Sequence, residues 1–329
     1  MWLMREGQTQ ATTLSDEFTG TARFKIIRRI GEGGTGYVYL AFDRKRGIEV
    51  ALKTLRKESP YGILRLKNEF RGLAELAHRN LVNLHDLHQQ DGTWFITMEH
   101  VDGVDFLEWV RPNRNVDVET RTDILRLRDV LEQLVRGLSA LHSAGRLHRD
   151  IKPSNLMVDR TGRLVILDFG LATRLGDADR FDIRGFSGTL EYMAPEQSEG
   201  VTPHPASDWY SVGVVLFQAL TGRLPFEGKP LKMAMEKRKK SGPAPSTINR
   251  KVPVDLDELC EGLLKLDPAE RSDEMAIIDV LALEPDESVS LSDGLMQRSD
   301  TRVLVGRERE LGGMIDALGS VRRGVPAVC

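Results

Sequence analysis

The chain has 329 residues, enough for one two-lobed domain with a sizeable core and additional segments. Charged residues make up 29% of the sequence and apolar residues 40%, and the formal net charge of −3 gives no reason to expect nucleic acid or a membrane as a main partner. The two cysteines, Cys260 and Cys329, are too few for a disulfide framework or a zinc site, which suits a reducing cytoplasm.

Nothing in the sequence predicts export or membrane insertion. The first ten residues lack the long apolar stretch of a signal peptide, and the longest apolar stretch, Val212–Leu220, is too short to cross a bilayer. The basic run Lys237–Lys240 is short, so we interpret it as the solvated end of a helix. Cys260 lies in an amphipathic pattern and is expected in the core. The sequence therefore predicts a cytoplasmic protein that binds neither nucleic acid nor membrane.

The N-terminal region combines a polar leader with a glycine cluster between strands. Residues 1–21 have no clear period and predict a flexible leader. The cluster Gly31–Val38 fits G-x-G-x-x-G-x-V, in which glycines let the backbone approach phosphate groups closely. A dinucleotide-binding fold would need a helix directly after the glycines, whereas residues 37–43 alternate as a strand does. A glycine-rich hairpin without a ligand is the alternative.

A lysine and a glutamate follow the glycine cluster on successive predicted elements. The strand pattern directs Lys53 to the same face as Ala51, toward the glycines. Apolar residues at helical spacing then predict a helix over 63–77. Glu69 on this helix is the best acidic partner for Lys53. The alternatives are an exposed strand lysine and an ordinary surface i,i+4 charge pair.

The rest of the chain alternates between strand and helix patterns, with a buried helix after Val212. The expected elements are a turn at His78–Val82, strands over 81–89 and 93–101 joined by a turn at Asp91–Gly92, helices over 106–110 and 124–144, a helix stop at Gly145, and helices near 231–240, 256–266 and 273–283.

The loop Leu147–Asn155 carries the residues on which the functional interpretation depends. Within nine residues it holds one carboxylate, two cations and one amide, with a proline between them. A hairpin over the following residues would return Asp168 toward Asp150. An aspartate that can accept a proton, a nearby lysine, and an amide and carboxylate that can hold Mg²⁺ fit phosphoryl transfer from a nucleotide.

These motifs resemble those of protein kinases. His148–Asn155 resembles the catalytic loop, and Asp168–Gly170 resembles the metal-binding DFG motif. Further matches in family order are the glycine cluster at 31–38, V-A-L-K at 50–53, G-T-L-E-Y-M-A-P-E at 188–196, D-W-Y-S-V-G at 208–213, and Arg271, which matches the arginine that pairs with Glu196. Arg79 replaces a proline in the family's turn, which weakens the rigidity of that turn but touches no chemistry.

The resemblance spans residues 22–283 and implies an α+β, two-lobed protein kinase fold. The N-lobe, about 22–101, would be a small antiparallel β-sheet with one main helix. The C-lobe, about 102–283, would be larger and mainly α-helical, and Asp208 would accept hydrogen bonds from the catalytic-loop backbone. The implied reaction transfers the ATP γ-phosphate to serine or threonine hydroxyls of a protein substrate, and Lys152 favours these over tyrosine.

The resemblance also implies a role for each site residue. Asp150 would orient and deprotonate the hydroxyl, and Lys152 would neutralise the γ-phosphate. Asn155 and Asp168 would bind Mg²⁺. Around ATP the resemblance further places Ile30, Gly31, Glu32, Gly33, Gly34, Thr35, Gly36, Val38, Ala51, Lys53 paired with Glu69, Met98 as the gatekeeper, and Glu99 to Val101 as the hinge.

The segment from Leu171 to Met193 resembles an activation segment. In the family, the arginine matching Arg149 usually pairs with a phosphate on this segment. Thr173, Ser187 and Thr189 supply the hydroxyls, and Ser187 is the first choice for a regulatory site. Thr189 matches a threonine that more often contacts the catalytic loop. Self-association for trans-autophosphorylation is therefore expected, and an unphosphorylated, ordered loop is the alternative.

The C-terminal region differs in composition from the kinase-like part. Residues 284–301 are rich in Ser, Asp and Glu and predict a linker. Val305–Leu311 resembles the opening of signal-transduction ATPase domains of the AAA or NB-ARC type. Residues 302–329 would then be the truncated start of such a domain, and the chain would be the kinase part of a larger, bacterial-type signalling regulator. An ordinary amphipathic helix is the alternative.

Two other functions compete with the kinase interpretation. A pseudokinase scaffold would need a lost catalytic group, and Lys53, Asp150, Asn155 and Asp168 are all present. A small-molecule kinase shares the aspartate and the asparagine of the loop. It lacks the segment at 188–196 and the pair of residues that Asp208 and Arg271 represent here. ATP turnover with and without a protein substrate separates the three functions.

Overall fold

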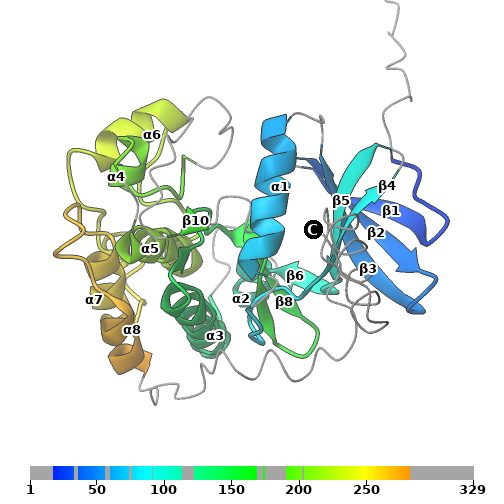
Figure 1. Cartoon of the computed structure of the whole chain (residues 1–329). Helices are drawn as coiled ribbons and strands as arrows, with labels where there is room; N and C mark the ends of the chain where they lie inside the picture. The colour runs from blue at the N-terminus through cyan, green and yellow to red at the C-terminus, as the bar shows by residue number, and fades with distance from the viewer. Residues whose placement is uncertain are drawn as a thin grey trace, which may run out of the picture.

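The computed structural model describes residues 18–32, 36–55, 60–73, 76–90, 92–112, 122–168, 173–174, 190–201 and 204–281. The earlier residues form a lobe built on one antiparallel sheet, and the later ones form a lobe of helices (Figure 1). We refer to these as the sheet lobe and the helical lobe. Their arrangement confirms the predicted α+β fold. The predicted leader up to residue 17, the linker, the C-terminal segment and Cys329 lie outside the described residues.

The sheet lobe holds five strands in the order β1-β2-β3-β5-β4, each antiparallel to its neighbours. These strands are β1 (Phe24–Glu32), β2 (Gly36–Asp43), β3 (Ile48–Leu55), β4 (Leu84–Gln90) and β5 (Thr93–Glu99). Along β3, Val50 and Leu52 join a small outer cluster, whereas Ala51 joins the main core. Because side chains alternate along a strand, Lys53 lies on the Ala51 face, as the sequence predicts.

The helix of the sheet lobe, α1 (Pro60–Leu73), packs against β4 and β5 on the side of the sheet that faces the helical lobe (Figure 1). The predicted range, 63–77, is wrong at both ends. The helix begins earlier because proline is well tolerated in a first turn. Farther along the chain, Asn80 is anchored on the helical lobe: its Nδ2 donates to the Leu164 carbonyl at 2.7 Å and to Gln133 at 3.0 Å.

The helical lobe is built around two long helices, α3 (Ile124–Ser143) and α5 (Pro205–Thr221). The others are α2 (Phe106–Val110), α4 (Pro195–Ser198), α6 (Pro230–Lys237), α7 (Val254–Leu263) and α8 (Glu274–Leu281). Asp123 caps α3 by accepting from the Arg126 N–H at 3.1 Å, and Gly145, at φ +69°, follows its end as predicted. None of the described helices has the length and hydropathy that a bilayer crossing requires.

A second, three-stranded sheet lies beneath the first lobe, in the order β6-β8-β9. The pair β8 (Leu156–Asp159) and β9 (Leu164–Ile166) is the predicted hairpin, but β6 (Gly103–Asp105) was not predicted. A Cβ atom at Gly103 would lie 2.0 Å from the Val158 carbonyl oxygen. This glycine therefore permits the close approach of β6 and β8.

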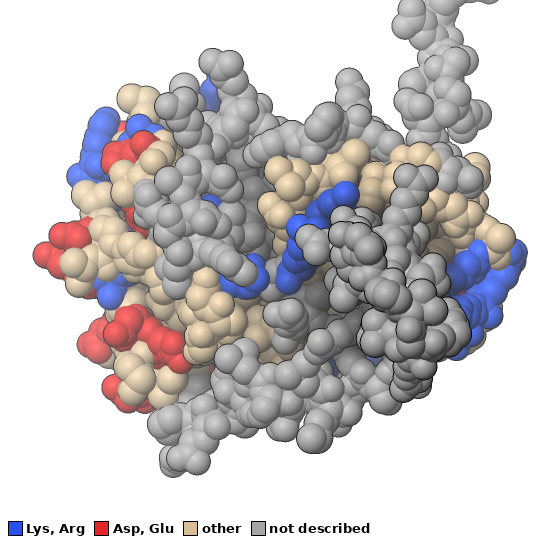
Figure 2. Space-filling model, in the orientation of Figure 1, with Lys and Arg blue, Asp and Glu red and all other residues tan. Residues whose placement is uncertain are grey.

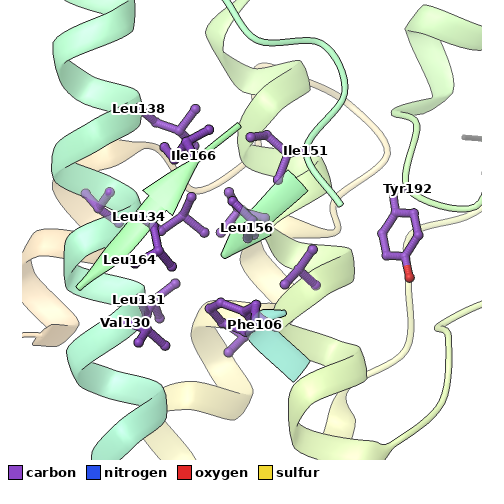
Figure 3. Packing of buried hydrophobic residues seen from close by; sticks show 14 of the residues in the cluster. Phe106, Val130, Leu131, Leu134, Leu138, Ile151, Leu156, Leu164, Ile166 and Tyr192 are labelled. Atoms are coloured by element: carbon purple, nitrogen blue, oxygen red, sulfur yellow. The ribbon is translucent and has the colours of Figure 1, made fainter. Parts of the chain in front are cut away.

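One continuous hydrophobic core joins α3 to this sheet. Figure 3 shows side chains of α3 directed at those of β8 and β9, with Phe106 of α2 beside them. The labelled residues of this contact are Val130, Leu131, Leu134, Leu138, Leu156, Leu164 and Ile166. Ile151 of the catalytic loop belongs to the same core, as does Cys260, which is buried as predicted. The loop Leu147–Asn155 is therefore anchored in this core through Ile151.

The charged side chains are unevenly distributed. Figure 2 shows acidic side chains over the outer helices of the helical lobe and basic ones at the far end of the sheet lobe. Exposed acidic residues there include Glu258, Glu261 and Asp279. The turn between β2 and β3 carries Arg44, Lys45 and Arg46. The helical lobe also carries basic side chains, among them the exposed Lys239 and Lys240, so its outer face is of mixed sign.

The prediction that Lys237–Lys240 is a solvated helix end is wrong for Lys237. The residue is 2% exposed, and its Nζ donates to the carbonyl oxygens of Leu190, Glu191 and Met193. Burial lowers the pKa of Lys237 to about 7. Lys237 lies one turn after the buried Met233, so it continues the inner face of α6, whereas the three residues after it are exposed.

An ion pair joins Asp43, at the end of β2, to Arg23, which directly precedes β1. The carboxylate of Asp43 is fully buried and accepts from Arg23 Nε at 2.9 Å, from Arg23 Nη2 at 2.7 Å and from the Lys45 N–H at 2.9 Å. Burial alone would raise the pKa of Asp43, but these hydrogen bonds outweigh it and bring the pKa to about 2. The ionised carboxylate therefore stabilises the folded state.

We expect Asp43→Asn to lower the free energy of unfolding at pH 7 by about 2 kcal/mol, since each pKa unit corresponds to about 1.4 kcal/mol. The folded pKa lies below the unfolded value of 3.8, so this stability is present above pH 3.8 and is lost as the pH falls toward 2. Denaturant unfolding of both proteins between pH 7 and pH 3 measures it. A difference that stays constant with pH would contradict the account. Glu261→Gln, in an exposed pair with Lys265, is the control and should change stability by less than about 0.5 kcal/mol.

Candidate active site

Hydrogen bonds of His148 shape the loop Leu147–Asn155. It follows β7 (Arg146–Leu147) and ends in the short helix η1 (Pro153–Asn155). His148 is fully buried, its Nδ1 accepts from the Asp150 N–H at 3.2 Å, and its Nε2 lies 3.0 Å from the Leu167 carbonyl oxygen. A carbonyl only accepts, so the histidine proton is on Nε2. His148 thereby ties Asp150 to the strand end that leads to Asp168.

Asp208, in the first turn of α5, binds the backbone of the loop Leu147–Asn155. Its carboxylate accepts from the His148 N–H at 2.9 Å and the Arg149 N–H at 2.8 Å, and it lies 2.9 Å from His142 Nε2. Burial would raise the pKa of Asp208, but the hydrogen bond from His142 and the other contacts outweigh it, so the pKa is lowered. The predicted contact between Asp208 and the loop backbone is confirmed.

Two residues beside the site have backbone conformations that L-amino acids rarely adopt. Arg149 has φ +67° and Asp168 has φ +58°, and within the described ranges they are the two residues other than glycine with positive φ. Such conformations persist where surrounding contacts hold them, and they cluster at functional sites. At Arg149, the bond from its N–H to Asp208 is such a contact.

Asp150 presents one engaged and one available oxygen. Its Oδ2 accepts from Lys152 Nζ at 2.7 Å and from Asn155 Nδ2 at 3.1 Å. Its Oδ1 is buried and receives no hydrogen bond from the described residues. Because no described residue satisfies this buried acceptor, the atom is suited to receive a hydroxyl proton from a substrate.

Lys53 connects the sheet lobe to the residues after β9. On β3 it lies opposite Val38 of β2 and Ile96 of β5, and it is 5% exposed. Its Nζ lies 2.5 Å from Asp168 Oδ1. Desolvation raises the pKa of Asp168, but the charge and the hydrogen bond of Lys53, together with the nearby charges of His148 and Lys152, outweigh it and bring the pKa to about 2, so Asp168 is ionised at neutral pH.

The predicted magnesium ligands suit that ion. Asn155 Nδ2 donates to the Asp150 carbonyl oxygen at 2.8 Å, which leaves the amide oxygen as an acceptor, and the Leu167 N–H donates to the Asn155 carbonyl oxygen at 2.8 Å. Asp168 therefore directly follows a residue, Leu167, whose backbone is anchored on Asn155. Mg²⁺ typically takes one or two protein oxygens and completes its shell with phosphate and water. In the described part of the chain, no cluster of three or more His, Cys, Asp or Glu could hold a metal by itself.

Apolar side chains line the sheet beside Lys53. Val38 and Ala51 lie on its face, and Ala51 is paired with Met98, which is 9% exposed. The side chain of Glu99 is already engaged: Arg163 holds both its oxygens at 3.0 and 3.1 Å, and the Asn83 N–H donates to it at 2.9 Å. The Glu99 N–H also donates to the Asn83 carbonyl oxygen at 2.9 Å, so both the side chain and the N–H of Glu99 are engaged within the described residues.

Some predicted site residues have a structural role or lie outside the described residues. A Cβ at Gly36 would lie 1.7 Å from the Thr54 carbonyl oxygen, so the pairing of β2 with β3 alone requires glycine there. Ile30, Gly31 and Glu32 lie at the end of β1, and Val101 follows β5. Outside the description are Gly33, Gly34, Thr35, Ser187, Thr189 and the side chains of Glu69 and of Thr173, which lies in β10 (Thr173–Arg174).

Two contacts that support the site were not predicted from the sequence. The Glu99–Arg163 pair joins the end of β5 to the β8–β9 turn, and its members are 64 residues apart in sequence. His142, on the last turn of α3, lies against Asp208. Neither contact has a local sequence signal, because each joins separate elements.

Comparisons with known proteins place the chain in a family. A family model described as the protein kinase domain matches residues 24–280. The chain therefore belongs to the protein kinase family. Serine/threonine-protein kinase PrkC of Bacillus subtilis is 32% identical over 255 residues, covering 76% of this chain and 38% of PrkC. Serine/threonine-protein kinase PknA of Mycobacterium tuberculosis is 35% identical over 262 residues, covering 77% of this chain and 59% of PknA.

A solved structure shares the fold. The twitchin kinase region from C. elegans aligns with a TM-score of 0.68 at 24% identity, covering 82% of this chain and 47% of that one. The predicted two-lobed kinase fold is confirmed. The chain spans about two fifths to three fifths of the length of the curated relatives that it matches.

Proposed function

We propose that this chain is a serine/threonine protein kinase that transfers the γ-phosphate of ATP to a hydroxyl of a protein substrate. The observation that carries the proposal is Asp150, with Oδ1 buried and available and Oδ2 fixed by Lys152 and Asn155. The names of the curated relatives support the same class.

In the proposed reaction, the substrate hydroxyl oxygen forms a bond to the γ-phosphorus of ATP, and the bond from this phosphorus to the bridging oxygen of ADP breaks. The hydroxyl proton passes to Asp150 Oδ1. Lys152, whose Nζ lies 2.7 Å from Asp150 Oδ2, neutralises charge on the transferred group. Asn155 and Asp168 would hold Mg²⁺, which neutralises charge on the phosphates when bound. Lys53 would bind the α- and β-phosphates.

The proposal places the nucleotide between the two lobes. Val38, Ala51 and Met98 would contact the adenine ring, and backbone groups from Glu99 to Val101 would form hydrogen bonds with it. Among the described residues, none forms a hydrogen bond with the Val101 N–H, which supports this placement. The glycine cluster from Gly31 to Gly36 would cover the phosphates, and Glu69 would pair with Lys53.

We further propose that the chain acts in the cytoplasm as the kinase part of a larger signalling protein. Trans-autophosphorylation on the activation segment, with Ser187 as the first choice, would bring a phosphate to Arg149. The support is the motif resemblance and the length of the curated relatives, which exceeds that of this chain.

The test is incubation of the purified chain with Mg-ATP, alone and with a generic protein substrate, followed by mass spectrometry of phosphorylated sites. Phosphoserine or phosphothreonine on the substrate or the chain is the expected result. ATP binding without phosphate on either protein would favour a scaffold. Phosphate on a small molecule but on no protein would favour a small-molecule kinase.

A further inference from the structure

A cation–π contact joins α1 to β5 of the sheet. Lys67 of α1 places its Nζ 4.0 Å from the centre of the Trp94 ring. Trp94 is 8% exposed, and Lys67 is half-buried. Among aromatic side chains tryptophan attracts a cation most strongly, and the attraction grows where water is excluded. In the part of the chain that the structure describes, no carboxylate lies at ion-pair distance from Lys67 Nζ, so the ring is the group that this charge contacts.

The contact adds direction to packing that is otherwise apolar. Leu66 of α1 is buried in the main core, and Ile63 and Phe70 pack against that core from the same helix. Apolar burial is a non-directional attraction, whereas an ammonium group must lie over the face of the ring to gain from it. Lys67 therefore defines the rotation and the height of α1 on the sheet more sharply than apolar burial alone does.

Trp94 lies on the face of the sheet that carries Lys53. Side chains two residues apart on a strand share a face, so Trp94 and Ile96 of β5 point to the same side of the sheet. Both belong to the main core. Ile96 lies opposite Lys53 in the pairing of β5 with β3. The ring that receives Lys67 is therefore in fixed register with the lysine to which we assign the α- and β-phosphates.

The helix that Lys67 holds also carries Glu69, the proposed partner of Lys53. Glu69 follows Lys67 by two residues in α1, so a contact that fixes Lys67 also fixes the backbone of Glu69. One residue of an α-helix rises about 1.5 Å, whereas hydrogen-bond lengths vary by only about 0.5 Å. A slide of α1 by less than one residue is therefore enough to separate Glu69 from Lys53.

We propose that Lys67 is a positioning residue for the kinase reaction, because its hold on the Trp94 ring keeps α1 in place. In that place, Glu69 can pair with Lys53. The inference rests on the proposed kinase function, and it assigns Lys67 no contact with ATP or with the protein substrate. Loss of the contact should lower kcat, since Lys53 aligns the phosphates during transfer. It should leave KM for a peptide substrate unchanged, since Lys67 contacts the sheet lobe.

The experiment compares wild type, Lys67→Met and Lys67→Arg with a single-serine peptide that wild type phosphorylates, chosen from a positional library. We expect Lys67→Met to lower kcat about fivefold and to leave KM for the peptide within about twofold, because a fivefold change corresponds to a contact of about 1 kcal/mol. Lys67→Arg keeps a cation over the ring and should stay within about twofold of wild type in kcat. Arg71→Met, at an exposed position in the last turn of α1, is the matched control and should match wild type.

Double variants show whether Lys67 acts through the two residues named. In a Trp94→Leu background the contact is already lost, so adding Lys67→Met should change kcat by less than about 1.5-fold. The same small change is expected in a Glu69→Gln background, because the effect of Lys67 passes through Glu69. A full fivefold loss in either background would overturn the proposal. So would an unchanged kcat in folded Lys67→Met, or a loss of kcat that Lys67→Arg shares.

Two further measurements keep the proposal testable if a variant is damaged. If Lys67→Met does not fold, Lys67→Gln removes the same charge with a polar side chain and carries the same expectations. Amide hydrogen exchange of α1, which needs no turnover, should accelerate in Lys67→Met but not in Arg71→Met, and equal exchange in the two would count against the idea. Failure of the kinase function itself would appear separately, as absence of phosphopeptide in wild type.

Discussion

An Asp150→Asn variant should lose on the order of 10³-fold in kcat, because a positioned general base contributes about 10² to 10⁴ in rate. Asparagine has the shape of aspartate and keeps one oxygen for Lys152 and Asn155. Its second atom becomes an NH₂ group, which cannot take the hydroxyl proton that Oδ1 would receive. Steady-state kinetics with a peptide substrate measures the loss, and KM for ATP should stay within about twofold.

Two comparisons make the result specific to the proton acceptor. Asp279→Asn, at an exposed position of α8, removes the same charge far from the loop and should match wild type in kcat. Thermal unfolding of Asp150→Asn should show that the protein is folded. A kcat within tenfold of wild type in a folded variant would show that Asp150 is not the base.

The second large effect is expected on stability. Arg271→Met should lower the free energy of unfolding by about 3 to 5 kcal/mol, the usual result of removing one partner from a buried ion pair. The Arg271 side chain is fully buried, and its nitrogens lie 2.9 and 3.3 Å from the two oxygens of Glu196. It also donates to the Ala206 carbonyl oxygen at 2.7 Å. Burial alone would raise the pKa of Glu196, and Arg271 is the main group that lowers it.

Denaturant unfolding of single and double variants tests this explanation. Because the loss comes chiefly from an unpaired buried carboxylate, adding Glu196→Gln to Arg271→Met should restore about 1 to 3 kcal/mol. Lys265→Met, which breaks an exposed pair with Glu261, is the control and should cost less than about 1 kcal/mol. A loss below about 1 kcal/mol in Arg271→Met, or no recovery in the double variant, would contradict the account.

The features that the sequence predicted well are those whose signal is local. Alternation along β3 placed Lys53 on the Ala51 face, and the apolar stripe of α3 gave that helix to within a residue. The hairpin that returns Asp168 follows from two short apolar runs and a turn. Motif resemblance added the Glu196–Arg271 pair and the contact of Asp208 with the catalytic loop, which periodicity cannot give.

The features that were missed depend on partners distant in the sequence. Lys237 looked like one of four solvated cations because its acceptors are carbonyl groups more than 40 residues earlier. The strand β6 has only three residues and is defined by its pairing with β8. None of these contacts produces a periodic pattern in the sequence.

The backbone conformations of Arg149 and Asp168 imply a conflict between thermostability and activity. A left-handed φ costs an L-residue about 1 to 2 kcal/mol, and glycine adopts it freely. Replacing either residue by glycine would relieve that strain but would remove the guanidinium or the carboxylate. Laboratory evolution for heat resistance alone would therefore favour changes that remove groups to which we assign roles in the proposed reaction. Stabilised variants of this protein should be selected for turnover and melting temperature together.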